Sequence, residues 1–144
     1  MYPEQIVTPM REELVSAGFQ ELRNAQDVDQ ALTSTTGTTL VVVNSVCGCA
    51  AGSARPGVKM AIEKAARKPE HLTTVFAGND AEATAQARKY FAPYPPSSPA
   101  MALFKDGKLV HFIERHHIAG RTPKMIDDNL LMELIRAESE QGKL

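Results

Sequence analysis

The run from Thr38 to Asn44 constrains the fold more than any other part of the chain. It reads Thr-Thr-Leu-Val-Val-Val-Asn, mostly β-branched, with no alternation between apolar and polar positions. A strand with one face in water alternates, whereas a parallel strand buried on both faces reads as a nearly continuous apolar run. We therefore expect a central parallel strand, covered on both faces by helices.

Helical and strand patterns alternate along the rest of the chain. Apolar residues at helical spacing predict helices over 6–17, from Asn24 or Asp27 to about 32, over 58–66 after Pro56, over 81–91, and from Thr122-Pro123 onward. Shorter runs predict strands at 19–22, 72–77, 101–104 and 109–113, the last two joined by a hairpin at Asp106-Gly107. Right-handed crossovers place helices on both faces of the sheet. The order predicts a single α/β domain over 1–144: a thioredoxin-like mixed sheet flanked by helices, with an extra N-terminal helix.

The first and last of these helices carry apolar residues that should face the core. In the first they are Ile6, Met10, Leu14 and Val15, and Pro9 marks either an early kink or the true helix start. In the last they are Met125, Ile126, Leu130, Leu131, Leu134 and Ile135. Turns are expected at Ser34-Thr35-Thr36-Gly37 and at Gly78-Asn79-Asp80, the second also capping the following helix.

Charge and hydropathy patterning exclude several classes of protein. The 144 residues include 16 basic and 17 acidic ones, a net charge of −1, which gives no indication of binding to nucleic acid or to an anionic membrane. The N-terminal residues lack the basic and then apolar pattern of an export signal, and no apolar run approaches the roughly 20 residues of a membrane span. We therefore expect a cytoplasmic protein. In a reducing compartment a cysteine pair is more often catalytic or metal-binding than a structural bridge.

Both cysteines of the chain, Cys47 and Cys49, follow the predicted central strand and are separated only by Gly48. In a helical turn, Cα atoms two residues apart lie about 5.4 Å from each other, close to the roughly 5.5–6 Å of a relaxed disulfide. The ring is short, and glycine bends most easily between the two sulfurs. Such a disulfide would be strained, easily reduced and of little value as a brace. The motif therefore predicts a redox pair.

Cys47 should lie at the N-terminal edge of the helix after the strand. Unpaired N–H groups and the helix dipole favour a thiolate there, so we expect Cys47 to be the more exposed, lower-pKa nucleophile and Cys49 the resolving thiol. Two alternatives remain at this point. One is a pair of buried packing cysteines. The other is a zinc or copper site completed by His111, His116 or His117, although no histidine has ligand spacing to the cysteines and we expect no bound metal.

Several segments together resemble the bacilliredoxin family. They are Val43-Asn44-Ser45-Val46-Cys47-Gly48-Cys49-Ala50-Ala51-Gly52, Ser97-Ser98-Pro99-Ala100-Met101-Ala102, Thr8-Pro9-Met10-Arg11, Thr74-Val75-Phe76-Ala77-Gly78 and His111-Phe112-Ile113. Members of this family are small thioredoxin-fold proteins, and the resemblance covers nearly the whole chain. The Trp-Cys-Gly-Pro-Cys signature of thioredoxin itself is absent, and the chain contains no Trp.

The resemblance implies reduction of mixed disulfides between protein thiols and bacillithiol, a low-molecular-weight thiol. Bacillithiolated proteins and bacillithiol would be the partners, and no further cofactor is implied. Cys47 would take over the bacillithiol, and Cys49 or a second bacillithiol would release it. Two other functions are compatible with the residues: general isomerisation or reduction of protein disulfides, and non-enzymatic thiol-based metal binding.

The Ser98–Pro99 bond is the second candidate site feature. It directly precedes a predicted strand, and the resemblance implies a cis proline near the cysteines that holds substrate, whereas Pro93, Pro95 and Pro96 should be ordinary loop prolines. Gly48, Ser98 and Pro99 are thus the residues that we expect beside the substrate.

Three polar residues near the cysteines are further candidates. Asn44 or Ser45 would hydrogen-bond the thiolate, support the turn or cap the helix. Arg55 would either offer a positive charge to the thiolate or to the malate carboxylates of bacillithiol, or face solvent. Pro56 would kink the helix.

Overall fold

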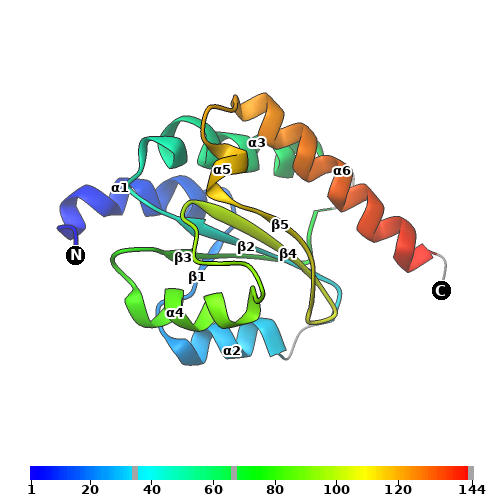
Figure 1. Ribbon diagram of the computed structural model, residues 1–144, viewed down its shortest axis with the longest axis horizontal. Coiled ribbons are helices and arrows are strands. Elements are labelled where there is room, and N and C mark those ends of the chain that lie inside the picture. Colours follow the sequence, from blue (N-terminus) through cyan, green and yellow to red (C-terminus); the bar gives the residue numbers. More distant parts are fainter. Residues whose placement is uncertain (34–35, 66–67, 143–144) are drawn as a thin grey trace.

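A five-stranded mixed sheet forms the centre of the molecule, in the order β1-β3-β2-β4-β5 (Figure 1). The strands are β1 (Gln20–Glu21), β2 (Thr38–Asn44), β3 (His71–Phe76), β4 (Ala100–Lys105) and β5 (Lys108–Ile113). β1, β3 and β2 run parallel, whereas β4 and β5 are antiparallel to their neighbours. The structure, a computed structural model, describes residues 1–33, 36–65 and 68–142, without the side chains at 131 and 134–142.

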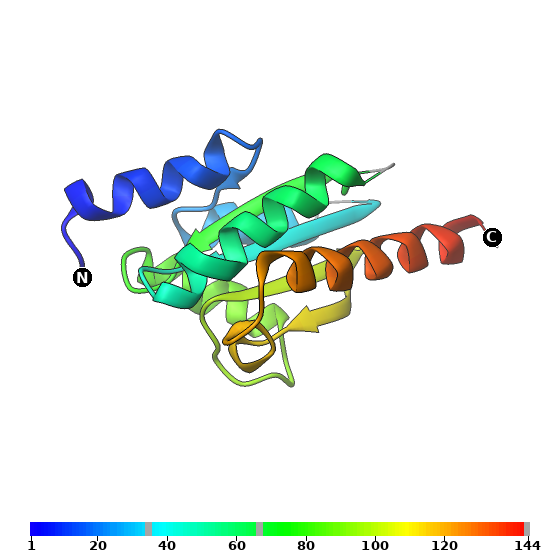
Figure 2. The same ribbon diagram turned by 90° about the horizontal axis from the view of Figure 1, so that it is seen from above.

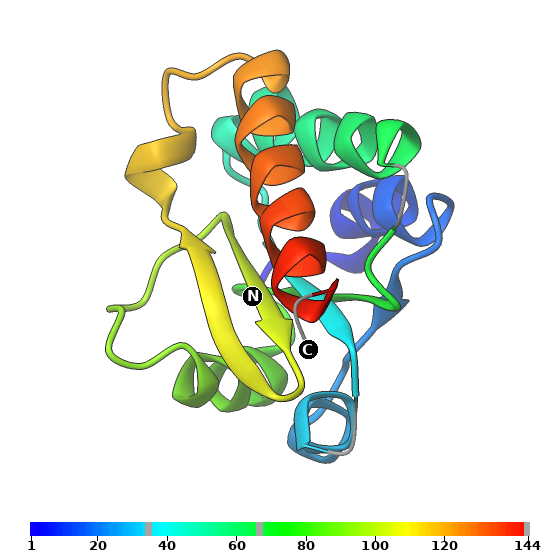
Figure 3. The same ribbon diagram turned by 90° about the vertical axis from the view of Figure 1, so that its right-hand side faces the viewer.

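Helices cover both faces of this sheet, as Figure 3 shows in side view. On one face lie α1 (Glu4–Val15), α3 (Arg55–Lys64), the short α5 (Arg115–Ile118) and α6 (Pro123–Gly142), of which the three long ones run along the same face in Figure 2. On the other face lie α2 (Ala25–Thr33) and α4 (Ala81–Tyr90). The predicted α/β fold with its extra N-terminal helix is thus confirmed.

Strand β2 lies at the centre of this arrangement, as its sequence predicts. All of its residues are buried, and they alternate between two cores. Leu40 and Val42 pack with α3 and α6, whereas Val41 and Val43 pack with α2 and α4. Because both faces are apolar, the strand reads as a continuous hydrophobic run.

The buried face of α1 differs from the predicted one. Val7, Arg11 and Leu14 face the core, whereas Ile6 and Val15 are exposed and Pro9 lies inside a helix that begins at Glu4. The reason is a buried ion pair: the Nη1 atom of Arg11 lies 2.6 Å from Oδ2 of Asp80. A pattern of apolar residues cannot reveal a face whose centre is an arginine.

The same ion pair changes the role of Asp80. Its side chain makes no capping hydrogen bond to α4 and instead also accepts from Nε of Arg23 at 3.1 Å. Asp80 is the N-cap residue of α4, so the predicted turn and cap at 78–80 and the helix start at Ala81 are confirmed, although the cap lacks the usual side-chain hydrogen bond.

In helix α6, one of the apolar residues expected to face the core is exposed. Ile126 and Leu130 are buried as predicted, but Met125 is 50% exposed. The side chains of Leu131, Leu134 and Ile135, also predicted to face inward, are not among those that the structure describes. Ser34 and Thr35 of the predicted turn and Ala66 of the predicted helix lie outside the described residues.

Two short elements and one proline also differ from expectation. Helix α5 was not predicted, and a π-helical segment η1 (Ala50–Ala54) precedes α3. The Ala92–Pro93 bond is cis, so Pro93 is not the ordinary loop proline expected.

Among the described residues, none of the helices is long and apolar enough to cross a membrane.

Candidate functional site

Cys47 lies at the N-terminus of the helical segment that follows β2. Its carbonyl oxygen accepts hydrogen bonds from the N–H groups of Ala50 at 3.0 Å and Ala51 at 3.2 Å. Gly48 and Cys49 are already helical, and the backbone continues through η1 into α3. The predicted position of Cys47 at the helix edge is therefore the position observed.

The thiol of Cys47 occupies the place of a helix-capping side chain. The backbone N–H of Cys49 donates to Sγ of Cys47 at 3.4 Å, as a residue two positions into a helix donates to its N-cap. This hydrogen bond is the largest cause that lowers the pKa of Cys47, and the thiol of Cys49, the charge of Arg115 and the N–H of Ala50 act in the same direction against desolvation. More of this thiol is consequently ionised at neutral pH than of an ordinary cysteine.

Exposure does not distinguish the two sulfurs, contrary to expectation. Cys47 and Cys49 are both half-buried free thiols, and Cys49 packs against the core beneath α3 and α6. Gly48 between them is exposed, and a Cβ atom built on it would meet nothing within 4 Å. The distinction between the cysteines thus rests on the hydrogen bond to Cys47 and on its lowered pKa.

A buried polar network fixes the link between β2 and Cys47. Nη1 of Arg55 donates to Oδ1 of Asn44 and to the carbonyl oxygen of Ser45, both at 2.9 Å. Asn44 also accepts from the N–H of Ser45, whose Oγ accepts from the N–H of Cys47 at 3.2 Å. Asn44 and Ser45 therefore support the turn.

Arg55 does not have either role considered for it from the sequence. It is 2% exposed, so it does not face solvent, and its Nε pairs with Oε2 of Glu13 in α1 at 3.1 Å. Its charge is used inside the fold rather than beside the thiolate. Pro56 follows it within the first turn of α3, at the junction with η1, rather than kinking the middle of the helix.

The Ser98–Pro99 bond is cis, as predicted. The register of the sheet places it near the cysteines, because Ala100 pairs with Val43 and the residue before it therefore lies level with the end of β2. Pro99 itself is buried and Ser98 is half-buried. Ser98 and Cys47 line the same cavity.

This cavity, of about 360 Å³, lies directly against Cys47. Three of its walls are loops: the turn after β2, the loop between β3 and α4, and the loop before β4. Helices α4 and α5 and the N-terminal segment complete it. The lining residues include Tyr2, Ser45, Cys47, Arg88, Ser98 and Arg115. Volumes of about 300–1,000 Å³ are typical of small-molecule sites, so the space beside the thiol is large enough for a small ligand.

Tyr2, Arg88 and Arg115 were not found by sequence reasoning. Tyr2 is fixed by a pair of hydrogen bonds: its N–H donates to Oδ1 of Asn79, and its carbonyl accepts from Nδ2 of Asn79. The two arginines lie about forty and seventy positions from Cys47 in the sequence, on α4 and α5. Only the folded arrangement brings them to the cysteines, and no local motif marks them.

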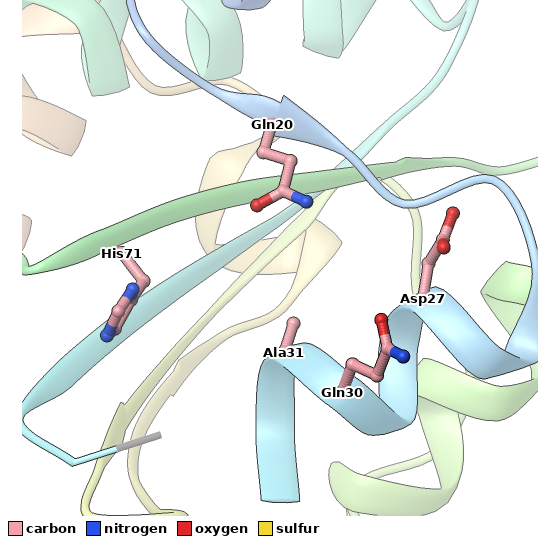
Figure 4. Close-up of a pocket in the computed structure, with 5 residues that line it drawn as sticks. All are labelled: Gln20, Asp27, Gln30, Ala31 and His71. Carbon is pink, nitrogen blue, oxygen red and sulfur yellow. The ribbon is translucent and has the colours of Figure 1, made fainter. Parts of the chain in front are cut away.

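A second cavity, of about 200 Å³, lies at the β1 edge of the sheet (Figure 4). Gln20, Asp27, Gln30, Ala31 and His71 line it, from β1, α2 and the start of β3. It contains none of the residues expected from the sequence to act on substrate. We assign it no part in the chemistry.

The histidines considered as metal ligands do not gather around the cysteines. Within the described residues, the one group of three or more metal-ligating side chains is Glu114, His116 and His117, which includes no cysteine. His117 accepts from the N–H of Glu114 through Nδ1 in a capping arrangement. His111 lies on β5, 3.0 Å from Oδ1 of Asn129. The arrangement therefore does not favour a mixed cysteine and histidine site.

Comparisons with known proteins place the chain in a defined class. A solved structure with a thioredoxin fold matches 82% of the chain and 91% of its own length with a TM-score of 0.56, at 15% sequence identity. The sequence model of a family described as disulphide isomerase matches residues 2–136. Together with curated relatives of known family, these matches define the class of the protein: a thioredoxin-fold thiol–disulfide oxidoreductase.

The relatives narrow the class to one family. A bacilliredoxin of Cytophaga hutchinsonii is 58% identical over 132 residues, which cover 92% of this chain and 96% of the relative. Bacilliredoxins of Bacillus cereus and Geobacillus kaustophilus are 57% and 54% identical, each covering 90% of both chains. The chain belongs to the bacilliredoxin family.

Proposed function

We propose that this protein removes bacillithiol from protein thiols. The thiolate of Cys47 attacks the bacillithiol sulfur of a mixed disulfide, forming a new sulfur–sulfur bond and breaking the old one. The protein thiolate leaves and takes up a proton from solvent. This step exchanges one disulfide for another, so it needs no metal, organic cofactor or external oxidant.

Cys49 completes the proposed cycle. Its thiolate attacks Sγ of Cys47, bacillithiol leaves as a thiol, and a disulfide joins Cys47 and Cys49. The two electrons that restore the dithiol come from free bacillithiol, which is thereby oxidised. A second bacillithiol that attacks the adduct on Cys47 directly would give the same products without Cys49. Either route requires reduced small thiols, and therefore a reducing compartment such as the cytoplasm.

One observation carries this proposal: Sγ of Cys47 accepts the N–H of Cys49 at a helix N-terminus and borders a cavity open to substrate. The hydrogen bond favours the thiolate of Cys47, and the cavity gives this thiolate access to the sulfur of a substrate. Ser98 lines the same cavity as Cys47, which supports a path for an extended substrate chain beside the thiol. Membership of the bacilliredoxin family supports bacillithiol as the small thiol.

The test follows the substrate by intact mass. A protein with one bacillithiolated cysteine, incubated with the reduced protein and free bacillithiol, should lose the bacillithiol mass in a catalysed reaction. The Cys47→Ser variant should show only the background rate. Equal rates for wild type and Cys47→Ser would contradict the proposal.

Reduction or isomerisation of protein disulfides is the second candidate, because the matching family is described as disulphide isomerase. The same assay separates the two functions when it includes a protein with an internal disulfide. Faster turnover of that protein than of the bacillithiolated one would favour the second candidate. We expect the bacillithiolated protein to react faster, because the cavity beside Cys47 has room for a small thiol.

A further inference from the structure

Arg88 presents an unneutralised charge to the cavity beside Cys47. It extends from α4 and is half-buried. Its Nε atom is excluded from solvent and has no hydrogen-bond partner among the described residues. Burial lowers the pKa of this guanidinium. Removing part of a cation from water without a partner costs free energy, and an anionic ligand in the cavity would offset this cost.

Arg115 brings a second positive charge to the same cavity. It lies at the start of α5, is exposed, and acts electrostatically on Cys47. Its backbone N–H is fixed by Oγ of Ser97 at 2.6 Å, so this end of α5 is held to the loop before β4. No aspartate or glutamate is among the described residues that line the cavity. The site therefore combines two guanidinium groups and a reactive thiol, with no acidic side chain in this lining.

We propose that Arg88 and Arg115 form an anion-binding subsite for the carboxylates of the low-molecular-weight thiol. This proposal rests on the proposed function, which supplies a small thiol that carries malate carboxylates. Guanidinium groups bind carboxylates through two parallel hydrogen bonds, and such bonds strengthen where water is partly excluded. The cavity volume of about 360 Å³ suits a molecule of this size.

The subsite decides which sulfur of the mixed disulfide Cys47 attacks. Carboxylates held by Arg88 and Arg115 place the sulfur of the small thiol against Sγ of Cys47 and leave the protein sulfur outward. Attack then transfers the small thiol to Cys47 and releases the protein thiolate, which takes up a proton. Attack on the other sulfur would release the small thiol and leave the enzyme joined to its protein substrate. The subsite thus favours productive transfer over the covalent complex.

The partition between these adducts is measurable in the Cys49→Ser variant, which cannot resolve either one. The probe is a neutral peptide with one cysteine, linked by a disulfide either to bacillithiol or to uncharged 2-mercaptoethanol. Intact mass at early times gives the ratio of small-thiol adduct to peptide adduct on Cys47. A change in the thiolate fraction of Cys47 alters both routes equally, so the ratio does not report the pKa effect of Arg115.

Three added substitutions are compared in this background: Arg88→Gln, Arg115→Gln and, as a control, Lys89→Gln. Lys89 neighbours Arg88 on α4, is exposed and does not line the cavity, so its variant has the same net charge. Each arginine variant should lower the ratio for the bacillithiol probe about tenfold, the size of one lost charge-assisted hydrogen bond. The control variant, and the 2-mercaptoethanol probe in every variant, should leave the ratio unchanged.

Other results would overturn the proposal in distinguishable ways. Adducts that form in a ratio unaffected by either arginine would remove the subsite and leave the proposed function intact. No adduct from any probe would contradict the proposed function itself. A third probe, a peptide with two glutamates beside its cysteine and linked to 2-mercaptoethanol, tests the other source of carboxylates. If the arginines steer that peptide onto Cys47, the subsite serves acidic protein segments and the proposal is wrong.

Discussion

The Nη1 atom of Arg55 lies 2.9 Å from Oδ1 of Asn44, inside the protein and one short turn away from the reactive thiol. The same nitrogen donates to the carbonyl of Ser45, and Nδ2 of Asn44 donates to the carbonyl of Met10 in α1. The N-terminal helix is therefore connected through one arginine and one amide to the segment that holds Cys47. Through these contacts the extra helix supports a site that it does not line.

Arg55→Leu should destabilise the protein by about 2–4 kcal/mol, because it leaves buried acceptors on Asn44 and Ser45 unsatisfied and breaks a buried charge network. Urea unfolding of the reduced protein measures this change. Glu13→Gln is the matched control: its carboxylate is 42% exposed, so its loss should cost at most about 1 kcal/mol. Equal effects of the two substitutions would show that the network is not the stabilising element.

Cys47 should react as a thiolate at a pH below that of an ordinary cysteine, because the N–H of Cys49 and the charge of Arg115 lower its pKa. The rate of alkylation by iodoacetamide, assigned to Cys47 by peptide mass, should be constant at high pH. It should fall as the pH drops through the pKa, with a midpoint below that of a free cysteine measured in the same way.

Two arginine variants test the cause of this shift. Arg115→Gln removes a charge that favours the thiolate, so the midpoint should move upward. Arg121→Gln, which removes an equal charge outside this cavity, should leave the midpoint in place. A wild-type midpoint at or above the value of a free thiol would contradict the assignment of Cys47 as the activated cysteine.

Gly57 permits the close packing of α3 on α6. A Cβ atom on this glycine would lie 2.7 Å from Cβ of Ile126 and 3.1 Å from the carbonyl oxygen of Pro123. Gly57→Ala should therefore destabilise the protein by about 1–3 kcal/mol, the usual range for overpacking.

Gly52→Ala provides the comparison for that measurement. Gly52 is also helical, but a Cβ atom on it would meet nothing within 4 Å. Alanine there should be neutral or should stabilise by up to about 1 kcal/mol, because glycine is a poor helix former. Thermal or urea unfolding of both variants checks the pair, and an unaffected Gly57→Ala would mean that the two helices separate without cost.

The sequence predicts those parts of the fold and site that depend on local patterns. The β-branched run at 38–44 indicates the buried strand, and the position of Cys47 just after it indicates the helix N-terminus. The burial of Arg11 and Arg55 could not be predicted, because a buried arginine resembles an exposed one until its partners, Asp80 and Asn44, are known.

The two arginines in the cavity wall could not be predicted from the sequence for a related reason. Arg88 and Arg115 lie on separate elements, and only the packing of α4 and α5 against the ends of the strands brings them to Cys47. The inward position predicted for Met125 is wrong because apolar spacing on α6 does not show how close α3 approaches.

The most direct test of the central claim is the location of the adduct on the enzyme. Each single-cysteine variant, Cys49→Ser and Cys47→Ser, is incubated with a bacillithiolated protein and analysed by intact and peptide mass. We predict that Cys49→Ser retains one bacillithiol on Cys47, because the activated thiol is present and its resolving partner is missing. Cys47→Ser should carry none above background. Bacillithiol on Cys49 of the Cys47→Ser variant, acquired at the wild-type rate, would contradict the central claim.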